Sequence, residues 1–330
     1  MSCQTVFEGV YSALPTPMTQ EREVDLEGLL NLMAWQLEPR NLCDEGLLVE
    51  RSDLERRGVS GFVLYGTTGE ASTLTIAERE VITTRSVERY PEHTLIAGVG
   101  TNSTVSSAEL ATQARSWGAD AGLLVTPYYN RPSQEGLYRH VLQVAESVPD
   151  WPLILYIVPS RAAVTIEVNT LDRILNACPQ VVAIKDASAD LAYGVEVIRC
   201  CEGRATVLSG DDPTALASWA IGAQGSISVM SNLFPAEMMT MFRLFQRGQL
   251  TSAQSLFHLI HPVIQALFID TNPVPLKCIL AELSRQGRIP LNAPLLEYVR
   301  PPLVELNSLH REFLFEEVLS RITGRLGSAL

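Results

Sequence analysis

The sequence predicts a (β/α)8 barrel with a helical C-terminal appendage, and three observations support this prediction. Short apolar or β-branched runs recur along the chain, each followed by a segment with helical periodicity. The runs are continuously apolar rather than alternating, which is typical of parallel strands buried on both faces. The chain has 330 residues, 46% of them hydrophobic, so it can hold one barrel of about 250 residues and an appendage.

Eight of these runs are the expected strands. They are residues 9–14, 61–65, 94–99, 121–126, 152–158, 181–185, 206–209 and 226–229. Helix-start patterns lie between the runs. The segments TIAE at 75–78 and SSAE at 106–109 have the spacing of a capping box. Asp212 before Pro213 predicts an N-cap followed by proline in the first turn.

The barrel is expected to occupy residues 1–234, and the C-terminal helices residues 235–330. A doubly wound sheet is the alternative fold, but it usually carries a glycine-rich phosphate loop after its first strand. Here the first run continues into LPTPMTQ, which has no glycine. The segment GVGTNS at 98–103 lacks the third glycine of a dinucleotide loop. The barrel is therefore the favoured fold.

Composition and charge narrow the classes of partner. The formal charge is −12 with a pI near 5.0, and no cluster of Lys and Arg occurs, which argues against binding to nucleic acid or to an anionic membrane. The first ten residues lack the pattern of a signal peptide. No apolar run reaches the length of about 18 residues that a membrane span requires. These features predict a cytoplasmic protein.

Neither a disulfide framework nor a metal centre is expected. The six cysteines are scattered and have no CxxC spacing, so they are interpreted as reduced thiols. His258 and His261 can share a helix face, but no further ligand lies near them in the sequence.

Lysine is scarce in this chain. The 25 basic residues include only two lysines, Lys185 and Lys277. Lys185 ends the apolar run 181–185, whereas Lys277 lies early in a predicted helix and receives no chemical role. A lysine, unlike an arginine, can become a neutral amine and attack a carbonyl. The simpler alternative is that Lys185 only extends its amine out of the strand end.

Unusual residues follow the other strands, at the rim where barrel enzymes carry their catalytic groups. The segment GTTGE at 66–70 is either a tight turn or a nest of donors for a carboxylate. The tyrosines of TPYYNRP at 126–132 could instead be core or interface aromatics, and Arg161 a surface cation. Asp211 and Asp212 are most simply a helix cap. Together, a desolvated amine, a carboxylate nest and a tyrosine predict a Schiff-base site for a 2-oxo acid.

Six segments resemble the dihydrodipicolinate synthase / N-acetylneuraminate lyase superfamily. The resemblance covers residues 7–300 in the right order. It is carried by GTTGEASTL, VTPYYNRPSQEGLY, ILYIVPSR, AIKDAS, LSGDD and NPVPLK. It implies that Lys185 forms an imine with pyruvate and that Thr68 and its neighbouring N–H groups bind the pyruvate carboxylate. It further implies that Tyr156 is the acid/base near the imine and that Thr67 links it to Tyr129. No cofactor is implied.

The resemblance also implies a second-substrate site and an assembly. Arg161 would bind the carboxylate of aspartate semialdehyde, and Gly210 and Ile227 would line the pyruvate pocket. The second tyrosine of YYN reaches a neighbouring subunit's site in the family, which implies a homotetramer built as a dimer of dimers. Ile157 and Ala162 stand where the synthases commonly have Asn and Thr, and this departure bears on the second-substrate pocket.

Two further departures from the family concern regions away from the chemistry. Residues 37–57 exceed the usual length between the first helix and the second strand. Because this insertion precedes a strand, it should lie at the bottom of the barrel. Members that bind lysine as an inhibitor use His or Glu at the positions of Ile76, Arg79 and Ser106, so little inhibition by lysine is expected.

The resemblance thus implies a lyase that condenses pyruvate with aspartate semialdehyde in lysine (diaminopimelate) biosynthesis. One alternative is another pyruvate-dependent class I aldolase of the same superfamily, acting on a sugar acid or on 4-hydroxy-2-oxoglutarate. A second alternative is a catalytically silent barrel that binds a ligand or a partner. Arg161 favours a short acidic aldehyde, and the joint presence of Lys185, Tyr156, Thr67 and Tyr129 argues against a silent barrel.

Overall fold

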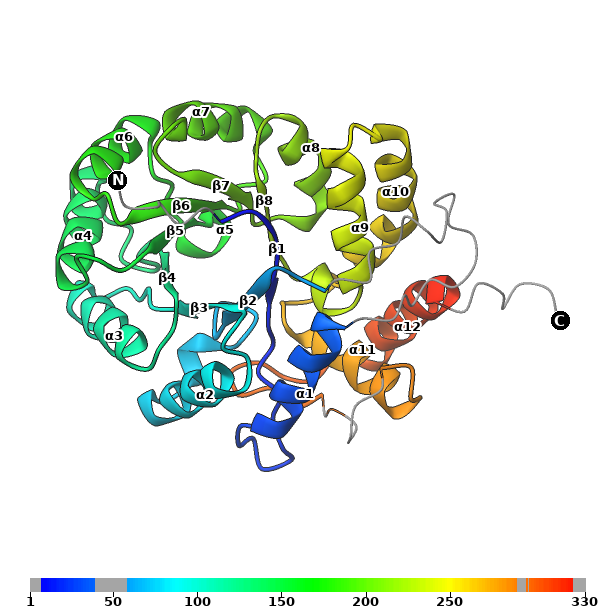
Figure 1. The fold of residues 1–330 in the computed structure, drawn as a ribbon. Helices are drawn as coiled ribbons and strands as arrows, with labels where there is room; N and C mark the ends of the chain where they lie inside the picture. The colour runs from blue at the N-terminus through cyan, green and yellow to red at the C-terminus, as the bar shows by residue number, and fades with distance from the viewer. Residues whose placement is uncertain (1–6, 39–57, 290–294, 296, 323–330) are drawn as a thin grey trace, which may run out of the picture. The chain divides into compact units, whose positions relative to one another are not determined.

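The eight strands of the described residues hydrogen-bond in chain order and close into a barrel (Figure 1). This computed structural model describes residues 7–38, 58–289, 295 and 297–322. The prediction of a (β/α)8 barrel with C-terminal helices is confirmed, and the doubly wound alternative is wrong. From residue 39 onward, the expected insertion at 37–57 lies outside the described residues.

The strands coincide closely with the apolar runs of the sequence. From β2 to β8, each adjacent pair runs parallel. Every residue of β2 and of β5 is buried, as expected for strands covered on both faces. The strands are β1 Gly9–Ala13, β2 Gly61–Leu64, β3 Thr94–Gly98, β4 Ala121–Val125, β5 Leu153–Ile157, β6 Val181–Asp186, β7 Thr206–Ser209 and β8 Gly225–Ser228.

Helices alternate with the strands and then continue alone to the C-terminus. The alternating helices are α1 Leu26–Leu37, α2 Ile76–Arg89, α3 Thr104–Ser116, α4 Gln134–Ser147, α5 Pro159–Ala162, α6 Val168–Ala177, α7 Leu191–Cys201 and α8 Ala215–Ala220. The C-terminal helices are α9 Pro235–Gln246, α10 Leu250–Ala266, α11 Val274–Arg285 and α12 Ser308–Ile322. Short 3-10 turns are η1 Ala71–Thr73, η2 Asp212–Thr214 and η3 Met230–Asn232.

The capping box predicted at 75–78 is confirmed at the start of α2. The amide of Thr75 donates to Glu78 Oε2 (2.8 Å), and the amide of Glu78 donates to Thr75 Oγ1 (3.2 Å). Each side chain thereby satisfies a backbone donor that the first helical turn leaves without a partner.

The N-cap predicted at Ser106 is wrong by three residues, and the one predicted at Asp212 is wrong by one residue. α3 begins at Thr104, and its N-cap is Ser103, whose hydroxyl accepts from the amide of Ser106. Ser103 offers the same hydroxyl one turn earlier than Ser106, so the helix begins there. The cap after β7 is Asp211 rather than Asp212, because the Asp211 carboxylate accepts from the amide of Thr214.

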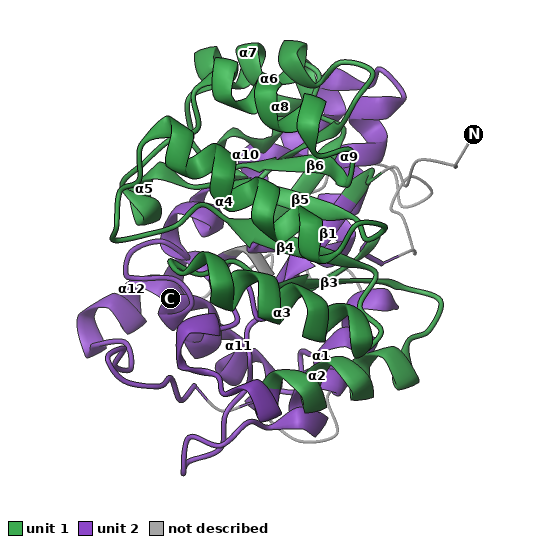
Figure 2. Cartoon of the chain, turned by 90° about the vertical axis from the view of Figure 1, so that its left-hand side faces the viewer, with its two compact units in different colours: residues 1–9, 60–64, 79–228 green, residues 10–59, 65–78, 229–330 purple. Residues whose placement is uncertain are grey.

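The chain forms two compact units, coloured separately in Figure 2. Unit 1 comprises residues 1–9, 60–64 and 79–228, and unit 2 comprises residues 10–59, 65–78 and 229–330. Within unit 1, the helices α3, α4, α6, α7 and α8 contact one another in chain order. Within unit 2, α10 packs on α9, and α12 packs on α10 and α11. A boundary between residues 234 and 235 remains a prediction.

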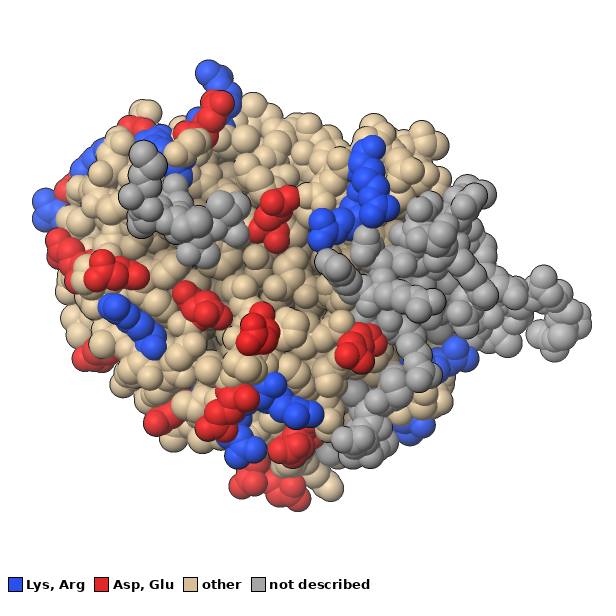
Figure 3. Space-filling model, viewed as in Figure 1, with Lys and Arg blue, Asp and Glu red and all other residues tan. Residues whose placement is uncertain are grey.

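The surface of the protein carries charges of both signs. On the face in Figure 3, acidic side chains are interspersed with basic ones. Among the residues that the structure describes, no helix has the length and apolarity to cross a bilayer.

Candidate active site

Lys185 and Tyr156 face each other across two adjacent strands. They are Cα partners in the register of β5 and β6, so their side chains leave the sheet on the same face. Each residue is only 6% exposed, and Lys185 Nζ lies 4.1 Å from the centroid of the Tyr156 ring. The pairing brings an amine and a phenol together in a largely dry environment, which suits proton exchange at an imine.

Gly210 makes room for the lysine stem. Its amide donates to the carbonyl of Asp186 (2.6 Å), which draws the end of β7 close to β6. A Cβ at Gly210 would lie 2.8 Å from Lys185 Cε and 2.8 Å from the Cβ of Ala187. Only glycine fits this approach without a shift. Ile227, the other residue expected to line the pocket, lies in β8 and is 1% exposed.

Asp186, directly after Lys185, belongs to a different layer. Successive strand residues point to opposite faces, so its carboxylate faces the covering helices. Accordingly, a Cβ at Gly194 of α7 would lie 3.5 Å from Asp186 Oδ2. Burial raises the pKa of the Asp186 carboxyl, and the amide of Ser188 donates to it. We assign Asp186 to the support of the strand end rather than to the chemistry.

Tyr129 is 87% exposed in the single chain, and its backbone has a left-handed φ of 71°. The next residue, Asn130, anchors the loop after β4 by donating from Nδ2 to the carbonyl of Asn102 (2.7 Å). Tyr129 therefore lies on an anchored loop, but its side chain is not buried.

Thr126, which the sequence analysis did not single out, is buried at the start of the loop. Its amide donates to the carbonyl of Tyr156 (3.0 Å).

Arg161 lies in the single turn α5 that follows β5, and it is exposed. The two unusual neighbours of this segment are both core residues, since Ile157 and Ala162 are each 0% exposed. Because Ile157 adjoins Tyr156 in the strand, its side chain points to the opposite face. Ile157 therefore packs on the face of the sheet opposite to the one that carries Tyr156 and Lys185.

The loop after β2 carries Thr67 and Thr68 in unit 2. The amide of Gly69 donates to the carbonyl of Gly66 (3.1 Å), and the amide of Glu70 donates to that of Thr67 (3.1 Å), closing a tight turn. A Cβ at Gly69 would lie 2.6 Å from the Cα of Tyr65, so the turn requires glycine. Thr67 is half-buried, whereas Thr68 is 3% exposed.

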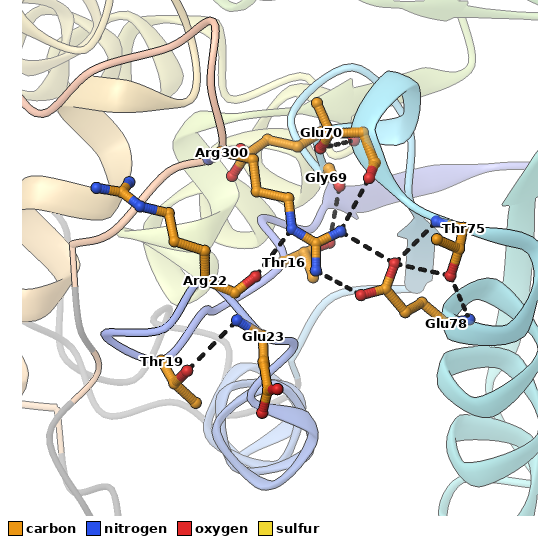
Figure 4. A network of polar contacts seen from close by, with 10 residues as sticks. Thr16, Thr19, Arg22, Glu23, Gly69, Glu70, Thr75, Glu78 and Arg300 are labelled. Atoms are coloured by element: carbon orange, nitrogen blue, oxygen red, sulfur yellow. Dashed lines mark hydrogen bonds and ion pairs between the residues drawn. The ribbon is translucent and has the colours of Figure 1, made fainter.

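A buried ionic network holds the same loop. Lys277 Nζ donates to Glu70 Oε1 at 2.6 Å, and the Arg300 amide donates to Glu70 Oε2 at 2.8 Å. Burial lowers the pKa of Lys277, which Glu70 partly offsets. In Figure 4 the Arg300 guanidinium lies between the main chain of Arg22 and the carboxylate of Glu78, to which it donates twice.

The sequence analysis missed this network. It gave Lys277 no role and treated Glu70 only as the end of a turn. The available signal was compositional: the chain has two lysines, and the second follows the NPVP segment that closes the resemblance. Buried lysines are rare unless they are paired, so a partner for Lys277 could have been sought among the acids of the other segments.

Within the described ranges, no group of three or more His, Cys, Asp or Glu side chains is placed to hold a metal ion. His258 and His261 lie on α10, and both rings contact that of Phe257. Cys178, Cys200, Cys201 and Cys278 are free thiols.

A family model, the dihydrodipicolinate synthetase family, matches residues 6–318. The chain belongs to this family. The family's 4-hydroxy-tetrahydrodipicolinate synthase from Nitratidesulfovibrio vulgaris (strain DSM 19637 / Miyazaki F) is 38% identical over 315 residues, covering 95% of this chain and 98% of the relative. The enzyme of the same name from Methanocaldococcus jannaschii is 36% identical, again over 95% of this chain and 98% of the relative.

Solved structures of the family have the same fold. The dihydrodipicolinate synthase of Aquifex aeolicus is 34% identical, with a TM-score of 0.84 over 96% of this chain and 98% of that chain. The chloride-inhibited enzyme of Acinetobacter baumannii, solved in complex with pyruvate, is 33% identical, with a TM-score of 0.82 over 96% of this chain and 99% of that chain.

Proposed function

We propose that this protein is a 4-hydroxy-tetrahydrodipicolinate synthase, which condenses pyruvate with L-aspartate 4-semialdehyde through a Schiff base. The observation that carries the proposal is the pairing of Lys185 with Tyr156 at the C-terminal ends of β6 and β5. The family's relatives bear this enzyme name, and one structural neighbour holds pyruvate. The product supplies lysine (diaminopimelate) biosynthesis, and the cytoplasm is the proposed location.

The reaction begins at Lys185. Its neutral amine attacks the keto carbon of pyruvate, and the resulting carbinolamine loses water to give an imine. Tyr156 is placed to supply the proton that leaves with the hydroxyl group. Loss of a methyl proton converts the imine to an enamine, whose carbon attacks the aldehyde of the second substrate. The amino group of that substrate then displaces Lys185, so the amine is regenerated and the ring closes.

The remaining roles follow the resemblance. Thr68 and the neighbouring backbone N–H groups bind the pyruvate carboxylate, since a nest of such donors suits an anion. Thr67 links Tyr156 to Tyr129 in a proton relay. Gly210 and Ile227 line the pyruvate pocket. No cofactor takes part in this scheme.

Arg161 sets the choice of the second substrate. Its guanidinium can bind a carboxylate through two charge-assisted hydrogen bonds, which aspartate semialdehyde offers close to its aldehyde. Exposure of Arg161 in α5 is compatible with contact to an incoming substrate. A sugar aldehyde lacks this carboxylate.

A side-by-side assay tests the proposal. Pyruvate is supplied with aspartate semialdehyde, glyoxylate, glyceraldehyde or N-acetylmannosamine, and kcat/KM is measured for each. We expect aspartate semialdehyde to give the highest value. Arg161→Ala should cost about 2–4 kcal/mol of transition-state stabilisation, and Arg161→Lys should recover only part of it. A higher kcat/KM for an aldehyde without a carboxylate would instead identify another pyruvate aldolase.

A further inference from the structure

Two segments far apart in the sequence meet inside unit 2. The loop at 66–70 is held through two side-chain contacts, one from Asn272 just before α11 and one from Lys277 in its first turns. Asn272 Nδ2 donates to Thr68 Oγ1 at 2.9 Å, and Lys277 Nζ donates to Glu70 Oε1 at 2.6 Å. Thr68, Glu70, Asn272 and Lys277 are each no more than 6% exposed. Water therefore does not substitute easily for either contact.

Glu70 is held at both oxygens, because its second oxygen accepts from the Arg300 amide at 2.8 Å. Its own backbone is left-handed, with φ of 56°, and Tyr65 at the other end of the loop has φ of 37°. A residue other than glycine adopts this region only where its surroundings impose it. The anchored carboxylate of Glu70 thus fixes the main chain that presents Thr67 and Thr68.

The hydrogen bond from Asn272 also sets the direction of the Thr68 hydroxyl. A hydroxyl carries one donor hydrogen and two acceptor lone pairs. Since the amide of Asn272 occupies a lone pair of Thr68 Oγ1, the hydroxyl hydrogen remains available for a different acceptor. A carboxylate oxygen is such an acceptor, and a hydrogen bond to a charged group is stronger than one between neutral groups.

We infer that Asn272 and the Glu70–Lys277 pair are positioning residues for recognition of the keto-acid carboxylate. The ion pair fixes the loop after β2, and Asn272 orients the Thr68 hydroxyl as a donor. This inference rests on the proposed function, in which Thr68 binds the pyruvate carboxylate. Under this inference Lys277, the only lysine besides Lys185, has a positioning role.

A purely structural role is the alternative. A buried ion pair is weak evidence for stability, and removing one partner alone leaves a buried charge without compensation. Loss of activity in a single variant would therefore not separate positioning from folding. The separating readout is selectivity between pyruvate and methyl pyruvate, which offers the same keto group without the carboxylate.

The experiment traps the imine with borohydride at increasing concentrations of each compound, and peptide mass mapping measures the adduct at Lys185. We expect Asn272→Ala to raise the half-saturating pyruvate concentration about three- to tenfold, the effect of one lost hydrogen bond. The value for methyl pyruvate should stay within about twofold of the unaltered protein. Asn272→Asp should weaken pyruvate binding further, because its carboxylate accepts the Thr68 proton and repels the substrate. At saturating pyruvate, kcat should fall much less than kcat/KM.

The ion pair is tested by Glu70→Gln, Lys277→Met and the double variant. We expect each single variant to melt at a lower temperature and to lose selectivity for pyruvate. In the double variant no charge is left buried alone, so the melting temperature should largely recover. Pyruvate selectivity should not recover, because the loop has lost its anchor.

Ser284→Ala is the matched control on the same helix. Ser284 is buried in α11, and its hydroxyl accepts from the Leu295 amide (2.9 Å). Neither residue belongs to the loop at 66–70. We expect a lower melting temperature with unchanged selectivity. Equal changes for pyruvate and methyl pyruvate in the Asn272 variants, or none for either, would overturn the inference alone. Absence of any adduct at Lys185 in the unaltered protein would overturn the proposed function and the inference with it.

Discussion

The lysine stem passes so close to Gly210 that no side chain fits there, and this gives a prediction at the scale of one residue. Gly210→Ala would place a methyl group 2.8 Å from both Lys185 Cε and the Ala187 Cβ. The Ala187 Cβ is attached directly to the main chain just after β6 and cannot move aside easily, so the lysine must shift. We expect imine formation to slow by about 10²-fold, as for other displacements of about 1 Å, with a stability loss of about 1–3 kcal/mol.

Gly194→Ala is the control for this prediction. Gly194 lies in α7 of the same unit, and its nearest neighbours would be 3.5 Å from a Cβ, an ordinary contact distance. Alanine in a helix should be tolerated or slightly stabilising. Adding borohydride at successive times after pyruvate reduces the imine present at each time, and this gives the rate of imine formation in both variants. A normal rate in Gly210→Ala would show that Gly210 does not shape the approach to Lys185.

Individual residues differed in how well the sequence revealed them. Lys185 was singled out because lysine is scarce and because the run before it marks a strand end. The role of Lys277 was missed because its partner, Glu70, lies 207 positions away in the sequence. No local pattern encodes such a pairing. Strand alternation places Ile157 on the face opposite Tyr156. Its burial depends on what packs against that face, which the sequence alone does not give.

At the scale of elements, α2 carries a charge network that makes a prediction about pH. Hydrogen bonds from Arg300 lower the pKa of Glu78 to about 2. A carboxyl with a lowered folded-state pKa contributes stability above its unfolded value of about 4.5, and this contribution is lost as pH falls toward about 2. The pair is partly exposed, so we expect a contribution of about 1–2 kcal/mol at pH 6.

Glu78→Gln tests this dependence, because glutamine can keep the capping box with Thr75 but not the charge. Urea unfolding at fixed protein concentration gives the free energy of unfolding of both proteins. The difference between them should be about 1–2 kcal/mol at pH 6 and should shrink toward zero near pH 2. Glu80→Gln, an exposed position of the same helix, should change stability by less than about 0.5 kcal/mol. A difference independent of pH would contradict the assigned charge effect.

Strand positions were predicted closely, whereas helix starts were not always. Each apolar run marks a strand because burial on both faces demands it, and the observed bounds differ from the runs by only a residue or so. A helix start depends on which of several nearby polar side chains captures the free amides. Ser103 does so where Ser106 was expected, and of the two aspartates expected to cap the helix after β7 it is Asp211 that does so. The composition of both segments permits either choice.

At the scale of the whole molecule, the exposed Tyr129 predicts an assembly. Tyr129, the proposed relay tyrosine, is 87% exposed in one chain, so we expect it to act in a neighbouring subunit. We therefore expect at least a dimer, and a tetramer of two such dimers, by light scattering at micromolar concentration. Tyr129→Phe should lower kcat by about 10²-fold while pyruvate still forms its adduct. A fully active monomer would contradict this role.

The barrel itself could be predicted because its periodicity is local and repeated eight times. The contacts of Asn272 and Lys277 with the loop after β2 could not, since they join segments that only the folded chain brings together.

The central claim is that Lys185 is the amine that forms the Schiff base. Pyruvate and borohydride are added together, and peptide mapping locates the reduced adduct. With Lys277 paired in a buried site and no other lysine in the chain, the assignment is direct. We expect one adduct, at Lys185, and none there in Lys185→Arg, which keeps the charge but has no attainable neutral amine. An adduct at Lys277 instead, or no adduct at all, would contradict the account.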